Sequence, residues 1–280
     1  MLKKIDQGKQ FVSQNSTLFR CPLCQQGMQA KQAGLVCERG HRFDVSKKGT
    51  LFFLNRQVST DYNQKMFVAR GRMIQSGMYQ PLLKKITDLL AEEEIVLDVG
   101  CGEGSFLNLV SQMRNLTGIG FDISKEGVYL ASNQMDANFW CVADLTNLPF
   151  ESHKFTTILN IFSPSNYREF QRILLPKGQV IKVVPRSGYL KELRQAFYPD
   201  DVDKQQYSNQ PVIAKFSEAF SESEHFEITY TFDVPKERQL DLLEMSPLEW
   251  GVSQTVKQQL QANPLDKITI DLDILVGKNV

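Results

Sequence analysis

The distribution of apolar and polar positions predicts alternating strands and helices over the last two thirds of the chain. A short apolar run at residues 94–99 is followed by a glycine-containing loop, and apolar residues then recur at helical spacing over 106–113. Further apolar runs cover residues 116–121, 139–142, 156–160 and 179–184. Strands that alternate with helices indicate a mostly parallel sheet covered on both faces. The pattern therefore predicts an α/β fold.

The loop after the first strand has an acidic residue before it and glycine at every second position. Its motif is D-x-G-x-G-x-G, formed by Asp98, Gly100, Gly102 and Gly104, with Glu103 between the last two glycines. Glycine lets a backbone approach a ligand, and the helix N-terminus offers unpaired N–H groups. Acidic groups beside the loop would repel a phosphate but suit a cationic ligand such as S-adenosylmethionine, although a glycine loop alone could equally be a tight turn.

Two further carboxylates follow later predicted strands. Asp122 ends the second strand, about 20 residues past the loop, where an acidic residue can bind ribose hydroxyls. Asp144, followed by Leu145, ends the third strand. Each carboxylate alone could be a solvated loop group. Three of them at successive strand ends, where open α/β sheets bind ligands, favour a ligand site.

This series of motifs resembles the class I S-adenosylmethionine-dependent methyltransferases over residues 79–280. The resemblance implies a Rossmann-like, mostly parallel sheet with a late antiparallel hairpin at residues 226–232 and 268–275. It places the glycine loop and Asp98 beside the methionine part of the cofactor, with Glu103 in the same loop. It further implies that Asp122 binds the ribose and that Asp144 and Leu145 flank the adenine.

Four potential metal ligands precede this fold. Cys21, Cys24, Cys37 and His41 have the spacing C-x2-C-x12-C-x3-H, which can close a tetrahedron around one structural Zn²⁺. A redox role for the first C-x-x-C pair is the alternative, which the second pair of ligands makes less favourable. Cys101 and Cys141 lie in apolar contexts, and we expect them to be buried thiols.

Charge is divided unevenly along a chain that has no net charge. Residues 1–85 hold 15 basic and 4 acidic side chains, whereas residues 86–280 hold 17 and 28. A basic segment that coincides with a zinc module and with interleaved aromatic residues favours a nucleic acid as partner, and a scattered solvated surface is the alternative. We expect Phe43, Leu51 and Phe52 to fill the core of the small module. The residues before about Ser16 carry no motif, and we expect them to be disordered.

The first residues of the chain and its hydropathy predict where in the cell the protein acts. The first 20 residues lack the apolar core of a signal peptide, and no stretch is apolar enough to span a membrane. Together with the free cysteines, these features lead us to expect a cytoplasmic protein without a membrane partner.

Motifs along nearly the whole chain resemble those of the bacterial 23S rRNA (guanine-N1)-methyltransferases. The matching segments are Cys21 to Cys24, Cys37 to Asp44, Gly77 to Leu82, Gly100 to Gly104, Asp122 to Lys125 and Met245 to Trp250. The resemblance implies methylation of guanine N1 in a 23S rRNA hairpin near the peptide exit tunnel, and a homodimer. We therefore expect a zinc-binding, basic RNA-recognition module at 1–56, a linker helix region at 57–85 and a methyltransferase domain at 86–280.

Four aromatic residues have expected roles beside the cofactor or the base. Tyr79, in the linker helix, is expected to cap the cofactor or to pack beside it. One branch of the family has a histidine that contacts the cofactor where this chain reads Pro185 to Leu190, and Tyr189 is our candidate for that place. Phe162 and Trp250 are expected either to stack on an extruded guanine or to pack in the core.

The expected chemistry requires mainly that two reactants are positioned, together with an acceptor for the proton on guanine N1. Asn160, acting through water, and Asp144 are the candidate acceptors. Two other functions are compatible with the sequence. One is a small-molecule methyltransferase in which the zinc module only stabilises the fold. The other is a noncatalytic RNA-binding factor in ribosome assembly.

Overall fold

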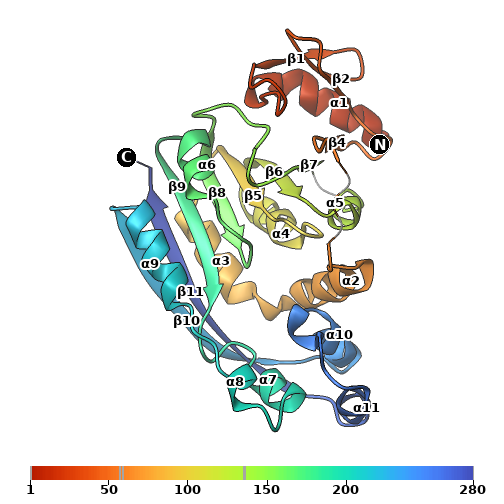
Figure 1. Ribbon diagram of the computed structural model, residues 1–280, viewed down its shortest axis with the longest axis vertical. Coiled ribbons are helices and arrows are strands. Elements are labelled where there is room, and N and C mark those ends of the chain that lie inside the picture. Colours follow the sequence, from red (N-terminus) through yellow and green to blue (C-terminus); the bar gives the residue numbers. More distant parts are fainter. Residues whose placement is uncertain (1, 57, 59, 135–136, 280) are drawn as a thin grey trace.

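The structure is a computed structural model that describes residues 2–56, 58, 60–134 and 137–279. Among these residues, no helix is both long enough and apolar enough to cross a membrane. The main sheet of the described chain has eight strands in the order β10-β11-β9-β8-β5-β6-β7-β4 (Figure 1). These strands are β4 (Leu51–Phe52), β5 (Glu94–Val99), β6 (Leu116–Asp122), β7 (Phe139–Val142), β8 (Phe155–Ile161), β9 (Leu174–Pro185), β10 (Ser223–Asp233) and β11 (Lys267–Lys278).

Strand direction in this sheet follows the prediction. The pairs from β4 to β9 are parallel, whereas β11 pairs antiparallel with both β9 and β10. β9 begins five residues before the predicted strand, because Leu174 also pairs with β8, across an irregularity between Phe155 and Thr157. The fold is therefore a class I methyltransferase sheet with a late antiparallel hairpin, as the sequence predicted.

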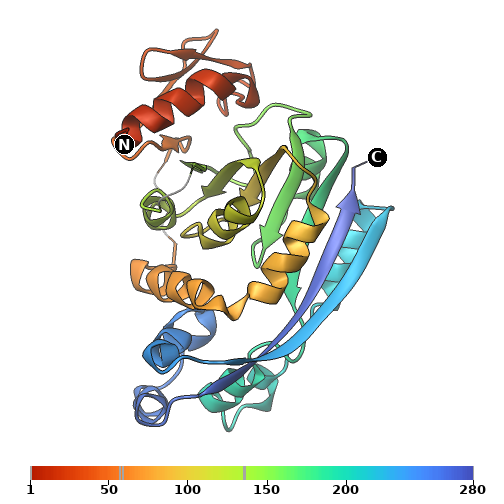
Figure 2. The same cartoon turned by 180° about the vertical axis from the view of Figure 1, so that it is seen from behind.

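Helices cover both faces of the sheet (Figure 2). One face packs against α3, α4, α5 and α7, and the other packs against α6 and α9. The helices are α1 (Lys4–Asn15), α2 (Gln64–Met73), α3 (Gln80–Leu89), α4 (Ser105–Met113), α5 (Lys125–Ala131), α6 (Tyr167–Ile173), α7 (Lys191–Phe197), α8 (Val202–Gln205), α9 (Gln210–Ala219), α10 (Gln239–Glu244) and α11 (Gln254–Ala262). A π-helical turn at Ile74–Met78 joins α2 to α3, and Gly77 turns the chain there with φ +92°.

The N-terminal module has its own small sheet but is not separate from the main one. Strands β1 (Met28–Lys31), β2 (Gly34–Cys37) and β3 (Arg42–Asp44) form an antiparallel meander, whereas β4 pairs with β7. Apolar residues of the module, including Phe19 and Leu51, belong to the same buried cluster as Leu97 and Phe139 of the main sheet. The module therefore shares a hydrophobic core with the larger domain.

Two expectations for this module are wrong. The residues before Ser16 are not disordered: they form α1, which is held by its buried Val12 and by Phe11, whose ring stacks on Phe139 at 4.5 Å between centroids. Phe52 is 43% exposed and does not fill the core, because β4 alternates its side chains and turns Leu51 inward instead. The buried phenylalanine of this segment is Phe53.

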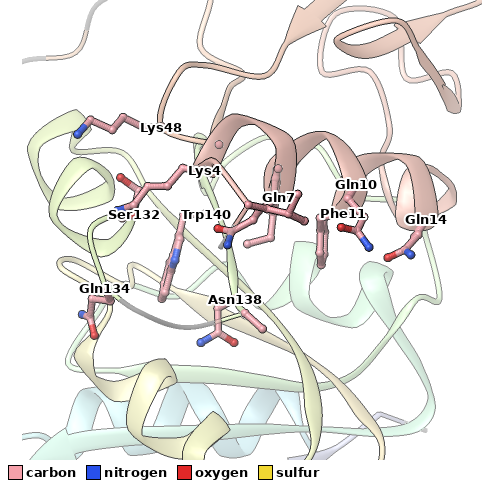
Figure 3. A pocket seen from close by; sticks show the side chains of 15 residues that line it. Lys4, Gln7, Gln10, Phe11, Gln14, Lys48, Ser132, Gln134, Asn138 and Trp140 are labelled. Atoms are coloured by element: carbon pink, nitrogen blue, oxygen red, sulfur yellow. Dashed lines mark hydrogen bonds between the residues drawn. The ribbon is translucent and has the colours of Figure 1, made fainter.

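A hollow of about 590 Å³ lies between α1 and the start of β7. Figure 3 shows Gln7, Phe11 and Gln14 of α1 on one side of it and Asn138 and Trp140 on the other. Lys4 closes one end by donating a hydrogen bond to the backbone carbonyl of Ser132. Helix α1 thus covers the start of β7.

Candidate functional site

The glycine loop has the predicted strand–loop–helix setting between β5 and α4. Gly100, Gly102 and Gly104 all have positive φ, at +67°, +55° and +83°. A Cβ on Gly104 would lie 2.7 Å from Trp140 Cη2, and a Cβ on Gly100 would lie 2.7 Å from the Cβ of Ser163. Glycine is therefore required at both positions for backbone conformation and for space.

Asp98 lies at the end of β5 under this loop and is only 2% exposed. Among the described residues, its Oδ2 is a buried atom without a hydrogen-bond partner. Burial, with the nearby Asp122 and Glu103, raises the pKa of Asp98 to about 8. A buried carboxylate oxygen that lacks a donor is suited to a ligand that carries a positive charge.

The two other carboxylates close to Asp98 are also buried. Asp122 accepts hydrogen bonds from the backbone N–H groups of Gly102 and Ser124, at 2.8 and 2.7 Å, and so ties the glycine loop to β6. Burial raises the pKa of Asp122, and it raises the pKa of Glu103 to about 7. Acidic groups gathered in this way disfavour phosphate and favour a cation.

On the adjoining side, Asp144 and Leu145 follow β7. Asp144 is half-buried, and its Oδ1 accepts hydrogen bonds from the backbone N–H and the hydroxyl of Thr146. Two hollows of about 350 and 360 Å³ reach Asp144 and Ile123, respectively. Leu54, Asn55, Arg56 and Val58, which follow β4, line both hollows. No motif in the sequence indicated that this segment lies beside Asp144 and Ile123.

An aromatic cluster packs on the other side of the glycine loop, next to the turn whose Ser163 lies against Gly100. Tyr79 packs against Phe106 and Phe162, and Phe162 stacks on Tyr189 at 5.6 Å between centroids. The hydroxyl groups of Tyr79 and Tyr189 are hydrogen-bonded at 2.5 Å, although the residues are 110 positions apart. Burial raises the pKa of Tyr189 to about 12. The structure thus brings together the two tyrosines that the sequence proposed for the cofactor site.

Helix α2 contributes residues that the sequence analysis missed. Phe67 is 2% exposed, and its Cε1 would lie 3.1 Å from a Cβ on Gly102. Arg70 lowers the pKa of both Glu103 and Asp122, against the effect of burial, and donates a hydrogen bond to the carbonyl of Met245. From the sequence we assigned the residues of α2 to the linker region at 57–85. Arg70 was counted there only among the basic residues of positions 1–85.

Asn160 and Trp250, two residues of the predicted substrate side, have different surroundings. Asn160 is fully buried; its amide nitrogen donates to the carbonyl of Pro164 at 2.9 Å, and its Oδ1 accepts from Ser165 and Lys182 at 2.7 Å each. Trp250 is 41% exposed and packs edge-on against Tyr62. Trp250 is thus available to an external ring, whereas the amide of Asn160 is already engaged.

The four predicted metal ligands converge in the N-terminal module. Their ligand atoms all lie within 4.8 Å of one another. Cys24 Sγ lies 3.6 Å from Cys37 Sγ, and His41 Nδ1 lies 3.4 Å from the Sγ atoms of Cys21 and Cys37. These separations fit a tetrahedron with zinc–sulfur bonds of about 2.3 Å and zinc–nitrogen bonds of about 2.0 Å. Cys101 and Cys141 are both buried, as expected.

Comparisons with known proteins agree with this division into a zinc module and a catalytic sheet. Residues 19–57 match the RlmA N-terminal zinc-ribbon family, and residues 96–178 match a methyltransferase domain family. The chain is 39% identical over 274 residues to the candidate 23S rRNA (guanine-N1)-methyltransferase YxjB of Bacillus subtilis, covering 93% of this chain and 97% of that relative. It is 31% identical over 185 residues, 62% of this chain and 66% of the relative, to the 23S rRNA (guanine(748)-N1)-methyltransferase of Streptomyces fradiae.

A solved structure supports the fold alone. An N-methyltransferase of Haemonchus contortus aligns with a TM-score of 0.50 at 16% identity, covering 78% of this chain and 58% of that one.

Proposed function

Because the chain belongs to the 23S rRNA (guanine-N1)-methyltransferase family, we propose that it transfers a methyl group from S-adenosylmethionine to N1 of a guanine in a 23S rRNA hairpin. The observation that carries the proposal is the environment of the Asp98 carboxyl group. Its buried and unpartnered Oδ2 lies under a glycine loop, where the ammonium group of the cofactor would satisfy it. The zinc ribbon and the basic segment around it support an RNA, rather than a small metabolite, as the methyl acceptor.

We assign the cofactor side as follows. Gly100, Gly102 and Gly104 let the backbone approach the methionine part, while Asp98 and Glu103 provide negative charge. Asp122 faces the ribose, and Asp144 with Leu145 borders the adenine. Tyr79 and Tyr189, joined through their hydroxyl groups, form the wall beside the methyl group.

When bound, the cofactor supplies an electrophilic methyl group on a sulfonium that is a good leaving group. Guanine N1 forms a bond to the methyl carbon, the carbon–sulfur bond breaks with its electrons on sulfur, and the N1 proton passes to an acceptor. The protein mainly has to align the two reactants. Phe162 and Trp250 are our candidates for stacking on the extruded base.

For the proton, Asp144 keeps unused acceptor sites, although its assignment to the adenine side places it away from the methyl group. A carboxylate offers about four acceptor sites, of which the two hydrogen bonds from Thr146 use only part. The Oδ1 of Asn160 already accepts from Lys182 and Ser165, which favours a structural role for that amide.

The proposal extends to the organisation of the protein. We propose that residues 1–56 form the RNA-recognition module, 57–85 the linker and 86–280 the catalytic domain, and that the protein is a homodimer acting in the cytoplasm. The 11-residue outer strand β10, whose far edge pairs with no described strand, is a surface on which a second copy could be held. Light scattering of the purified chain tests the dimer.

Methyl transfer is tested with labelled S-adenosylmethionine and 23S rRNA from a strain that lacks this enzyme. We expect a primer-extension stop at one guanine of a hairpin, and we expect Asp98→Ala to lose it while still binding the RNA. Label on a small metabolite, with none on rRNA, would indicate a small-molecule methyltransferase. RNA binding without any labelled product would indicate an assembly factor.

A further inference from the structure

Lys182 is a buried cation that neither the cofactor site nor the zinc site explains. It lies on β9, opposite Asn160 of β8, and is 3% exposed. No ion pair includes it in the described part of the chain, and burial alone lowers its pKa to about 8. A lysine buried without a carboxylate is costly, and an apolar side chain would fill the same space more favourably.

The three N–H groups of the Lys182 ammonium all donate to residues 160–165, at the end of β8 and in the turn that follows it. Lys182 Nζ donates to Asn160 Oδ1 at 2.7 Å, to Ser165 Oγ at 2.8 Å and to the carbonyl of Ser163 at 3.3 Å. Asn160 in turn donates to the carbonyl of Pro164 at 2.9 Å. Lys182 and Asn160 thus hold residues 163–165, the part of the turn that directly follows Phe162.

The turn begins with a residue in an unfavourable conformation. Phe162 has φ +54°, in the left-handed region that a bulky residue rarely adopts. Its N–H donates to the carbonyl of Val183, next to Lys182, at 3.1 Å. Such strained residues persist only where their surroundings hold them, and they are frequent at functional sites.

The strain has a visible consequence for the candidate site. With this backbone, the ring of Phe162 lies against Tyr189, Tyr79 and Phe106. On the same turn, Ser163 donates to the carbonyl of Val99 and its Cβ occupies the space that a side chain on Gly100 would need. The turn therefore lies between the glycine loop and the aromatic cluster.

We propose that Lys182 is a positioning residue for methyl transfer, which acts by holding the Phe162–Ser165 turn so that the Phe162 ring faces the reacting groups. The inference rests on the proposed function. Lys182 itself touches neither the cofactor nor the base in this assignment. Its contribution is three directed hydrogen bonds that an apolar residue could not make.

The test compares Lys182→Met with Lys278→Met. Lys278 also donates to a side-chain amide on β9, Gln179 Oε1 at 2.8 Å, three residues before Lys182 and farther from the Phe162 turn. We expect Lys182→Met to lower kcat about 100-fold, as a misplaced reacting group does, with both KM values within about twofold of wild type. Lys278→Met should keep the wild-type kcat. An unchanged kcat in Lys182→Met, or equal losses in kcat and in cofactor affinity, would overturn the proposal.

Two further measurements separate positioning from mere stability. In a double-mutant cycle, Lys182→Met should lower kcat by less than about threefold when Phe162 is already Ala, because the lysine acts through that ring. Additive losses would contradict this route. If Lys182→Met does not fold, Ser165→Ala replaces it, since that change removes one of the three acceptors and should lower kcat about tenfold.

A structural readout keeps this inference distinct from the proposed function. In a crystal structure of Lys182→Met, we expect Phe162 to leave the left-handed region and its ring to leave Tyr189. Retention of φ near +54° would refute the role of Lys182 whether or not the protein methylates rRNA. If wild type and Lys278→Met both fail to methylate rRNA, the proposed function fails and this readout still decides the inference.

Discussion

Asp98 carries the clearest electrostatic imbalance at the candidate site. Its carboxyl group is buried, one oxygen has no donor, and Asp122 and Glu103 are close enough to raise its pKa further, to about 8. The free protein therefore holds a proton on Asp98 at neutral pH. A bound cation favours the charged form, so ligand binding and proton release are coupled at this residue.

We predict that the affinity for S-adenosylmethionine rises from pH 6 to pH 8, by at most about tenfold per pH unit, as Asp98 becomes ionised. Calorimetric titrations in buffers of different ionisation enthalpy should detect proton release on binding. Asp98→Asn should bind weakly, with a shallower pH dependence that is due to Glu103, whose pKa is about 7. Equal wild-type affinity at pH 6 and pH 8 would contradict the coupling.

The raised pKa of Asp98 also makes the stability of the free protein depend on pH. This stability falls as the pH rises, whereas the affinity for the cofactor increases. Because the folded-state pKa of Asp98 lies above the unfolded value of about 3.9, its contribution to stability is complete below pH 4 and is lost as the pH rises to about 8. The free energy of unfolding of wild type relative to Asp98→Asn should therefore fall over this range, by at most about 1.4 kcal/mol per pH unit. Urea denaturation at several pH values measures it.

At the scale of elements, the start of α4 shows how local sequence and tertiary packing act on the same residue. Gly104 is the residue before α4 and has φ +83°, a conformation that the glycine pattern of the loop made predictable. What the pattern could not reveal is that Trp140 of β7 and Ala131 of α5 fill the space beside it. Those contacts pack the glycine loop and the start of α4 against β7 and α5.

We predict that Gly104→Ala lowers the free energy of unfolding by about 3 kcal/mol, from backbone strain together with overpacking. Gly251→Ala is the matched control, because Gly251 has φ +81° but nothing within 4 Å of a Cβ, and it should cost about 1 kcal/mol. Urea denaturation measures both variants. Equal losses would show that Trp140 and Ala131 yield to the added methyl group.

At the scale of the whole molecule, ion pairs with the larger domain neutralise part of the basic excess of residues 1–85. Several basic residues of the first 85 pair with acidic residues of the larger domain, namely Arg72 with Asp241, Lys65 with Glu244 and Arg20 with Glu169. Others in the module, including Lys31, Arg39 and Lys47, are exposed. The basic surface available to a polyanion is therefore smaller than the composition indicates, and it lies at the module's end of the molecule (Figure 1).

We predict that changing Lys31, Arg39 and Lys47 to Gln weakens RNA binding. The negative slope of log K against log salt should become shallower by about 2, because fewer phosphates are contacted. The matched control changes Lys191, Lys215 and Lys236, which are exposed on the larger domain, to Gln and should leave the slope unchanged. Filter binding of the rRNA hairpin between about 50 and 200 mM salt measures both variants. An equal effect of the two triple changes would mean that the module is not the RNA-binding surface.

The sequence alone determined the features that depend on short stretches of chain. The period of apolar residues determined the order of strands and helices, and ligand spacing identified Cys21, Cys24, Cys37 and His41. The glycine loop and the carboxylates at the strand ends were predictable because the ends of parallel strands lie along one edge of a sheet.

Only the tertiary structure decided which distant residues meet. It paired Tyr79 with Tyr189, laid Phe67 over Gly102, joined β4 to β7 and buried Lys182 among acceptors from β8 and the following turn. Helix α1 also became ordered through a contact, between Phe11 and Phe139, that no local pattern contains. Local sequence determines backbone preference, whereas the packing of elements that are far apart in the chain determines which side chains share a site.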